Sequence, residues 1–292
     1  MLALAFPDYL PQAQRLANRL KVELKEISIH YFPDQESLVR LPAKISEHIL
    51  LIRSLNQPNE KLVELLFAAK TARRLGAKRI TLIAPYLCYM RQDIENQPGE
   101  AISQQIIGEW FADLFDDLIT VDPHLHRISS LDEAFPMKNA IALSAGTVIT
   151  ALLQKKFVHA ILVGPDSESK QWVAGLAEKI GFDYGIATKI RQGDKQVKIS
   201  LPKTDFQNQT IVIVDDMAST GRTILETTKL LRSQGANDIY AVVTHPLFCN
   251  DAEQLLRKSG IKAIWSTDSI SHSTAIMHLD ELLADAVKQI CN

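Results

Sequence analysis

Cysteine is scarce in this 292-residue sequence, and the few cysteines lie far apart along the chain. The three present, Cys88, Cys249 and Cys291, are odd in number and form no CxxC pair. A disulfide scaffold or a structural zinc site therefore does not fit, whereas a reducing compartment does. We expect a cytoplasmic protein.

Long hydrophobic runs are also missing. The longest mostly apolar stretch, residues 141–153, is interrupted by Ser144, Gly146 and Thr147, and it is too short to span a bilayer. The N-terminus has no basic region before its short apolar run, which Pro7 interrupts, so it does not look like a signal peptide. We expect no membrane partner.

Neither sign of charge is in large excess. The sequence has 32 Lys and Arg residues against 34 Asp and Glu residues, which gives a formal net charge of −2. A general nucleic-acid binder would be more basic, so we expect no nucleic-acid partner, while a local basic pocket for a small anion still fits. At about 100–200 residues per domain, the length suggests two domains. A hydrophobic content of 46% supplies enough apolar material for two cores.

Short apolar runs alternate with longer helical patterns along the chain. The runs cover residues 49–52, 80–84, 118–121, 160–163, 211–214 and 239–243. Because they are apolar on both faces, they predict parallel strands that are covered by helices on each side. Among the helical patterns between them, Asn59 and Ser103 are candidate N-caps.

The order βαβαβ occurs twice and predicts an α/β fold of two similar domains, each a mainly parallel sheet flanked by helices. The pattern is interrupted near residues 135–146. We therefore expect an N-terminal domain over residues 1–143 and a C-terminal domain over residues 144–292. The last helix falls within residues 144–292, and the alternative is that it packs back on the first domain.

The most specific pattern is Ile-Val-Ile-Val-Asp-Asp-Met-Ala-Ser-Thr-Gly-Arg-Thr, residues 211–223. Two adjacent acids follow a buried strand, and small or hydroxyl residues lead into a helix: Asp215, Asp216, Ser219, Thr220, Gly221 and Thr223. Ligands of open α/β sheets bind at such strand ends, and a helix N-terminus offers free N–H groups to a phosphate. The acids suit the vicinal hydroxyls of a sugar, or a cation held against it. The alternative, turn acids and an ordinary helix cap, leaves the paired acids unexplained.

This stretch resembles the phosphoribosyl-pyrophosphate (PRPP) binding motif of type I phosphoribosyltransferases and of ribose-phosphate pyrophosphokinase. The motif alone does not choose between these two families. Further segments look like ribose-phosphate pyrophosphokinase, in the order in which that family has them. The resemblance covers nearly the whole chain, from Phe32 to the C-terminus, and it implies a type I phosphoribosyltransferase-like fold in both domains.

Two segments of the N-terminal half resemble ATP-binding segments of that family. Phe32-Pro33-Asp34-Gln35-Glu36 is similar to the Phe-Ser-Asp-Gly-Glu segment that reaches adenine from a neighbouring subunit, and residues 84–93 are similar to Pro-Tyr-x-x-Tyr-x-Arg-Gln-Asp. The resemblance implies six ATP contacts: Phe32, Asp34, Glu36, Arg91, Gln92 and Asp93. Without it, Phe32 is a core residue, Asp34 a turn residue and Arg91 a solvated cation.

Three further segments correspond to the phosphate-transfer machinery of the family. Residues 120–124 are similar to Thr-Val-Asp-Leu-His, and residues 163–169 occupy the place of a glycine-rich pyrophosphate loop, with serines instead of the glycines. Residues 188–191 match the Lys-x-Arg of a mobile catalytic loop. The resemblance implies catalytic roles for His124, Lys189 and Arg191, and it implies magnesium ligation by Asp122, His124 and Asp166.

The resemblance implies transfer of the β,γ-diphosphoryl group of ATP to O1 of ribose 5-phosphate, giving PRPP and AMP with Mg²⁺ as cofactor. The sugar phosphate would bind at residues 215–223, and the protein would be a homo-oligomer, a dimer or a multiple of dimers. Three alternatives stay open. A nucleobase phosphoribosyltransferase needs no ATP site, an inactive regulatory partner would explain the altered residues 166–169, and a sugar-phosphate sensor needs neither Arg91 nor Lys189.

Overall fold

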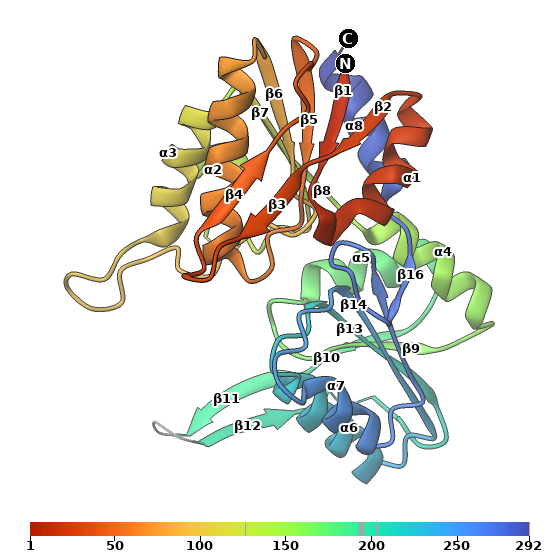
Figure 1. Cartoon of the computed structure of the whole chain (residues 1–292). Coiled ribbons are helices and arrows are strands. Elements are labelled where there is room, and N and C mark those ends of the chain that lie inside the picture. The colour runs from red at the N-terminus through yellow and green to blue at the C-terminus, as the bar shows by residue number, and fades with distance from the viewer. Residues whose placement is uncertain (126, 193–195, 203, 292) are drawn as a thin grey trace. The chain divides into compact units, whose positions relative to one another are not determined.

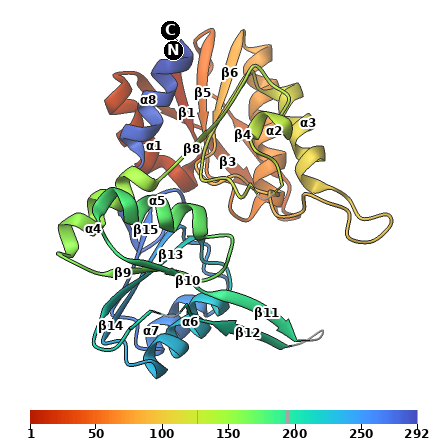
Figure 2. The same cartoon turned by 180° about the vertical axis from the view of Figure 1, so that it is seen from behind.

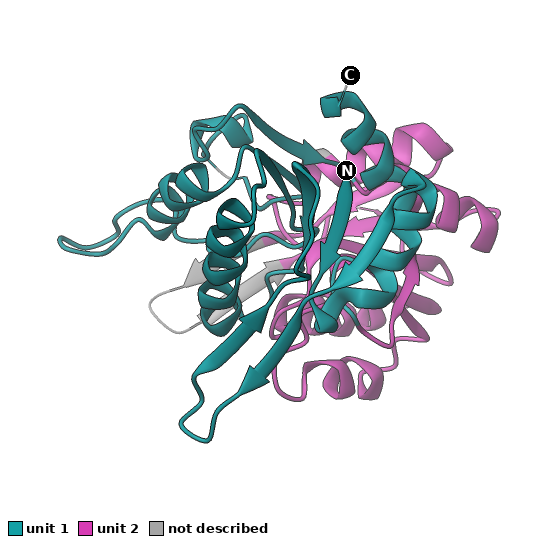
Figure 3. Cartoon of the chain, turned by 45° about the horizontal axis from the view of Figure 1, so that its top comes forward, with its two compact units in different colours: residues 1–144, 269–271, 279–292 teal, residues 145–268, 272–278 magenta. Residues whose placement is uncertain are grey.

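The structure is a computed structural model that describes residues 1–125, 127–192, 196–202 and 204–291, without the side chains of residues 171 and 189–199. The chain forms two compact units (Figure 3). Unit 1 comprises residues 1–144, 269–271 and 279–292, and unit 2 comprises residues 145–268 and 272–278. Each unit is a parallel sheet with helices on both faces, so the predicted α/β fold of two similar domains is confirmed.

Unit 1 is built around a parallel sheet in the order β2-β1-β5-β6-β7-β8, and β3 and β4 form an antiparallel hairpin beside it (Figure 1). Its elements are β1 (Leu2–Ala5), η1 (Pro7–Tyr9), α1 (Leu10–Leu20), β2 (Glu23–Glu26), β3 (Ser28–Tyr31), β4 (Ser37–Arg40), β5 (His48–Ile52), α2 (Pro58–Arg74), β6 (Arg79–Ile83), α3 (Ser103–Leu114), β7 (Asp117–Val121), η2 (Leu131–Glu133), β8 (Asn139–Leu143) and α8 (Asp280–Cys291).

The central strands of unit 1, β1, β5, β6 and β7, are mostly buried on both faces because helices cover both. Alternate residues such as Leu2 and Leu4 of β1 and Ile49 of β5 share one core with Leu65 of α2 and Phe111 of α3. Helices α1 and α8 pack against each other, and α8 also contacts β7 and β8. The last helix of the chain therefore packs within unit 1.

Unit 2 has a sheet of the same kind, in the order β10-β9-β13-β14-β15-β16, and β11 and β12 form an antiparallel hairpin. Its elements are α4 (Gly146–Lys156), β9 (Ile161–Gly164), α5 (Lys170–Ile180), β10 (Tyr184–Ile186), β11 (Thr188–Gln192), β12 (Gln196–Ser200), β13 (Thr210–Met217), α6 (Arg222–Ser233), β14 (Asp238–His245), α7 (Ala252–Lys258), β15 (Ala263–Thr267) and β16 (Ala275–Met277). Figure 2 shows α4 and α5 on one side of this sheet and α6 and α7 on the other.

All six predicted strands are present, as β5, β6, β7, β9, β13 and β14. Both predicted N-caps are wrong by one or two residues. Helix α2 begins at Pro58 after an N-cap at Gln57, and α3 begins at Ser103 itself, after Ile102. Proline fixes a helical φ at the first turn, so Pro58 sets the start of α2. The Asn59 side chain instead accepts a hydrogen bond from the Tyr89 hydroxyl.

Candidate functional site

The two predicted sugar-binding acids lie at the C-terminal end of β13. This strand runs between β9 and β14, and Asp215 pairs in register with Val243. Asp216 is buried, and Asp215 is half-buried. Both acids are therefore fixed by a central strand of the sheet, at the edge where ligands of parallel sheets bind.

The loop after β13 ends on a glycine that the local structure requires. Gly221 is the N-cap of α6 and has a φ of +67°, in the left-handed region that favours glycine. A Cβ atom at this position would also lie 3.1 Å from the Leu256 side chain. Helix α6 therefore starts directly after the loop that carries Ser219 and Thr220, and Thr223 lies in its first turn, where N–H groups without a helical partner can bind a phosphate.

Like charges gather around Asp215. Burial raises the pKa of the Asp215 carboxyl well above its usual range, and the negative charges of Asp216 and Asp166 raise it further. A hydrogen bond of 3.1 Å from the Asp216 N–H to Asp215 Oδ1 opposes these effects. Hydrogen-bond donors or a cation placed here would relieve the repulsion, which suits sugar hydroxyls or a metal ion.

Asp166 lies at the end of β9, the strand next to β13. Its Oδ1 accepts hydrogen bonds from the N–H groups of Glu168 (3.1 Å) and Ser169 (3.3 Å), and Ser169 Oγ donates to the Asp166 carbonyl at 2.6 Å. A Cβ atom on Gly164 would lie 2.2 Å from Ser169 Oγ, so only glycine allows this tight turn. Sequence reasoning did not single out Gly164, although a glycine that ends a buried strand is a signal of close approach.

The predicted adenine segment forms the turn of the β3–β4 hairpin. Phe32 is 41% exposed, so it is not a core residue. Asp34 Oδ1 accepts a hydrogen bond of 3.2 Å from the Glu36 N–H, and Gln35 has a φ of +73°. Asp34 therefore shapes the turn, and the hairpin presents an aromatic ring and two acids to solvent.

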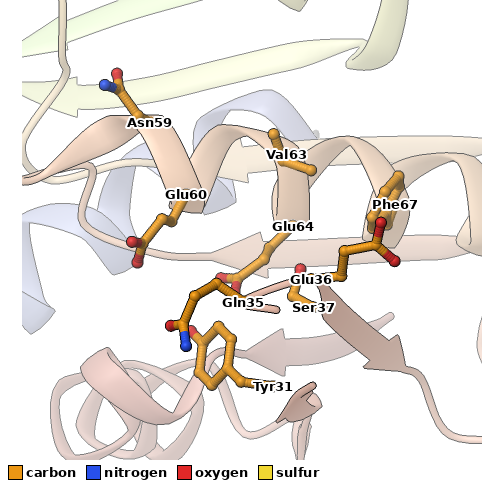
Figure 4. A pocket seen from close by; sticks show the side chains of 9 residues that line it. All are labelled: Tyr31, Gln35, Glu36, Ser37, Asn59, Glu60, Val63, Glu64 and Phe67. Atoms are coloured by element: carbon orange, nitrogen blue, oxygen red, sulfur yellow. The ribbon is translucent and has the colours of Figure 1, made fainter. Parts of the chain in front are cut away.

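A pocket of about 550 Å³ lies between this hairpin and α2 (Figure 4). Three carboxylates line it, from Glu36 of the hairpin and from Glu60 and Glu64 of α2, and the apolar side chains of Val63 and Phe67 border it. Glu64 is buried and ion-paired with Arg53 at 2.6 Å. Of the predicted ATP-binding residues, Glu36 lines this pocket.

The three predicted ATP-binding residues after β6 differ in their surroundings. Arg91 is exposed. Gln92 Nε2 donates to the Ile94 carbonyl at 2.9 Å, and Asp93 Oδ1 is ion-paired with Arg127 Nη1 at 2.6 Å. Gln92 and Asp93 therefore hold the local chain.

The predicted catalytic and metal residues come from three places. Asp122 follows β7 with a φ of +37°, and its N–H donates to the Leu143 carbonyl at 2.8 Å. Asp122 and His124 are half-buried. Lys189 and Arg191 lie in β11, paired with Ile199 and Val197 of β12, and their side chains lie outside the described residues.

The described part of the chain contains no group of three or more His, Cys, Asp or Glu side chains arranged to hold a metal ion. Within the same residues, no helix has both the length and the hydrophobicity needed to cross a bilayer.

A parallel sheet whose central strand ends in two acids, followed by a hydroxyl-rich loop and a glycine-capped helix, defines a phosphoribosyltransferase-like protein. Residues 5–114 match the model of the N-terminal domain of ribose phosphate pyrophosphokinase, and residues 137–277 match the phosphoribosyl transferase domain. A ribose-phosphate pyrophosphokinase of Methanopyrus kandleri is 31% identical over 99% of both chains. That of Saccharolobus solfataricus is 32% identical over 88% of this chain and 89% of its own.

The chain belongs to the ribose-phosphate pyrophosphokinase family. A crystal structure of phosphoribosylpyrophosphate synthetase from Mycobacterium smegmatis has the same fold, with a TM-score of 0.84 at 23% identity over 99% of this chain and 98% of the other. The expected family and its kinase-type enzyme class are confirmed. The match of residues 5–114 to an N-terminal pyrophosphokinase domain disfavours the nucleobase phosphoribosyltransferase alternative.

Proposed function

We propose that this chain transfers the β,γ-diphosphoryl group of ATP to O1 of ribose 5-phosphate, giving PRPP and AMP, and that residues 215–223 hold the sugar phosphate. The observation that carries the proposal is the acid pair at the end of β13, with Asp216 buried and Asp215 half-buried, followed by the glycine-capped start of α6. This one loop offers acceptors for sugar hydroxyls and donors for a phosphate.

The sugar phosphate would be held at both of its ends. The N–H groups at the start of α6, with the hydroxyls of Ser219, Thr220 and Thr223, would bind the 5-phosphate. Asp215 and Asp216 would accept hydrogen bonds from the 2- and 3-hydroxyls, which leaves O1 facing the nucleotide. Transfer of a phosphoryl group depends mainly on such alignment and on charge neutralisation, so no covalent enzyme intermediate is needed.

The nucleotide would bind through residues of unit 1. Phe32, Asp34 and Glu36 would frame the adenine, because an exposed ring can stack on a base and acids can accept from its amine. Arg91 offers a planar fork of donors to phosphate oxygens, Gln92 would contact the nucleotide, and Asp93 would support this segment through Arg127.

Three side chains would act on the transferred group and the leaving AMP. His124 would lie at the triphosphate, and Lys189 and Arg191 would stabilise the negative charge that develops as AMP leaves. These two cations lie in β11, which pairs with β12 in an antiparallel hairpin, and this hairpin would close over a bound nucleotide.

Mg²⁺ is the proposed cofactor, and the acids present fit it. This ion is usually held by one or two carboxylates together with substrate phosphates and water, so it needs no cluster of three protein ligands. Asp122 and Asp166 supply such carboxylates. His124 is a softer nitrogen donor and suits the triphosphate better than the ion. When bound, Mg²⁺ neutralises phosphate charge.

We propose a homo-oligomer, with a dimer as the smallest active unit. Large apolar side chains are exposed together on the hairpin and on α2: Tyr31, Phe32, Leu38, Val63 and Phe67. A neighbouring subunit that received the hairpin would cover this surface. Light scattering of the purified chain tests the assembly. A cytoplasmic location is also proposed, because the exposed thiols of Cys249 and Cys291 are unpaired.

The test is an assay of the purified chain with ATP, Mg²⁺ and ribose 5-phosphate, which follows AMP and PRPP. Release of AMP that depends on the sugar phosphate supports the proposal. Consumption of PRPP with a nucleobase would indicate a transferase instead. Binding without turnover would indicate the inactive regulatory partner or the sugar-phosphate sensor.

The same assay tests the catalytic residues. His124→Ala and Lys189→Ala should keep the fold and lower turnover. Each loss should correspond to ~2–4 kcal/mol of transition-state stabilisation. Lys262→Ala is the matched control, because Lys262 pairs with Asp238 at the opposite end of β14 and should leave turnover unchanged. Near-normal turnover in both test variants would remove these assignments.

A further inference from the structure

A short segment after β14, residues 246–250, lies directly against the loop that we assign to the sugar phosphate. The Phe248 N–H donates to the Ala218 carbonyl at 2.8 Å, and the Cys249 N–H donates to the Ser219 carbonyl at 2.9 Å. In the other direction, the Ala218 N–H donates to the His245 carbonyl at 3.0 Å. The two segments that follow β13 and β14 therefore stay hydrogen-bonded to each other beyond the ends of these strands.

Phe248 adopts a backbone conformation that is costly for a bulky side chain. Its φ of +36° is positive, and strain of this kind persists only where the surrounding structure enforces it. Phe248 is 9% exposed and belongs to the core of unit 2. The centroid of its ring lies 4.9 Å from the centroid of the His272 imidazole. Burial of this ring therefore enforces the conformation that presents the two N–H groups to the loop.

The loop is also supported from the side of α7. Helices α6 and α7 pack together (Figure 1), and the Gly221 position faces Leu256 and Ala252 of α7. Cys249 Sγ lies 3.6 Å from Ser219 Oγ. The backbone of residues 218–221 is thus held by segment 246–250 on one side and by α7 on the other.

We propose that Phe248 is a positioning residue, whose buried ring holds segment 246–250 so that the backbone of Ala218 and Ser219 is preorganised for the sugar phosphate. The inference rests on the proposed function of the loop. A loop that is already ordered loses less conformational freedom when its ligand binds. Loss of the ring should therefore weaken ribose 5-phosphate binding more than it affects the nucleotide or the chemical step.

The kinetic test separates positioning from stability. Phe248→Ala should raise KM for ribose 5-phosphate about tenfold, equivalent to about 1.4 kcal/mol, with KM for ATP and kcat changed by less than about threefold. Phe248→Leu keeps most of the buried volume and should restore KM to within about twofold of the unmodified chain. Ile239→Ala is the control, because Ile239 is fully buried in the same core at the opposite end of β14, and its loss should lower Tm without raising this KM.

The thiol of Cys249 provides a second readout. Cys249 is exposed, whereas burial raises the pKa of the Cys88 thiol to about 12 and makes it unreactive. In a Cys291→Ser chain, 5,5′-dithiobis(2-nitrobenzoic acid) therefore reports on Cys249. Saturating ribose 5-phosphate should slow the labelling, and half-protection in the Phe248→Ala chain should need about tenfold more sugar phosphate.

The outcomes distinguish this inference from the proposed function. If Thr220→Val raises KM for ribose 5-phosphate and Phe248→Ala does not, the positioning role is wrong and the sugar-phosphate site stands. If neither variant changes this KM, the site assignment itself fails. Where Phe248→Ala does not fold, Phe248→Val decides: a KM above that of Phe248→Leu supports positioning, and a KM equal to that of the unmodified chain overturns it.

Discussion

The C-terminal ends of β5 and β13 occupy the same place in two sheets of the same strand order. Ile52 ends its ladder opposite Ile83, and the next residue is Arg53. Near the end of β13 in unit 2, Asp215 pairs with Val243, and the next residue is Asp216. One sheet therefore places a cation where the other places an acid.

The surroundings of the two residues differ as much as their charges. Arg53 is 3% exposed, is ion-paired with Asp8 (3.1 Å) and Glu64 (2.6 Å), and has its guanidinium carbon 4.1 Å from the Phe6 ring centroid. Lys61 completes the cluster with an ion pair of 2.7 Å to Asp8. We call Asp8, Arg53, Lys61 and Glu64 the ionic cluster.

One strand end contributes to stability through ion pairs, whereas the other carries the proposed binding site. The ionic cluster balances two cations against two acids, so unit 1 neutralises its strand end with its own side chains. The end of β13 instead gathers Asp166, Asp215 and Asp216, and the charges of Asp216 and Asp166 raise the pKa of Asp215. A bound cation or sugar hydroxyls would relieve this repulsion. The proposed sugar-phosphate site therefore depends on the loop chemistry of one strand end, since the fold is common to both units.

The largest expected effect is on the ionic cluster. Arg53→Met leaves the buried Glu64 carboxylate without its ion pair, so it should lower the free energy of unfolding by about 3–5 kcal/mol. Denaturant unfolding measures the loss. The double variant Arg53→Met, Glu64→Leu should recover much of it, because an apolar pair replaces a buried ionic one.

Arg19→Met is the matched control for this cluster. Arg19 is also ion-paired within unit 1, with Asp280, but its side chain is 47% exposed. Its removal should cost less than about 1 kcal/mol. Equal losses of unfolding free energy from Arg53→Met and Arg19→Met would show that the ionic cluster does not stabilise the end of β5. The proposed contrast between the two strand ends would then be wrong for unit 1.

The next effect concerns the acid pair. Asp216→Asn keeps the shape of the side chain but removes a charged acceptor for sugar hydroxyls. A hydrogen bond to a charged group contributes about 1.5–3 kcal/mol, so kcat/KM for ribose 5-phosphate should fall about 10- to 150-fold, with KM for ATP unchanged. Steady-state kinetics with each substrate varied in turn measures this. Asp238→Asn, at the start of β14, is the control, and an equal fall there would contradict a specific role for Asp216.

A smaller effect is expected on stability at the same site. Because the pKa of Asp215 is raised in the folded chain, stability is lost as the pH rises from its ordinary value of 3.8 through the raised value. Asp215→Asn cannot ionise, and its Oδ1 can still accept from the Asp216 N–H. The variant should therefore gain about 1 kcal/mol at pH 7 and nothing below about pH 3.8. A gain of the same size at both pH values would contradict this cause.

The two strand ends also mark how far the sequence could be interpreted. The apolar runs predicted β5 and β13 closely, and the motif at residues 211–223 predicted the acid pair at the end of β13. Both features could be predicted because each depends on residues that are consecutive in the sequence. The ionic cluster was not foreseen. Asp8 and Arg53 are 45 residues apart in sequence, and no local pattern indicates that they meet each other or Glu64. Gly164 and Phe248 were missed for the same reason, since their importance depends on what packs against them.

The smallest effect concerns the starts of the two helices that follow these strands. Both N-caps have left-handed backbones, but Gln57 (φ +52°) precedes α2 where Gly221 (φ +67°) precedes α6. A left-handed backbone destabilises the folded state by about 1–2 kcal/mol at a non-glycine residue. Glycine avoids this cost but lowers the free energy of unfolding by about 0.4–1 kcal/mol, because it makes the unfolded chain more flexible. Gln57→Gly should therefore raise the free energy of unfolding by about 0.5 kcal/mol and leave activity unchanged. Gly221→Ala should have the opposite sign and also raise KM for ribose 5-phosphate, because its new Cβ would press on Leu256. Parallel denaturant unfolding of the two variants measures the contrast, and a loss of stability in both would mean that the left-handed cap of α2 is not strained by Gln57.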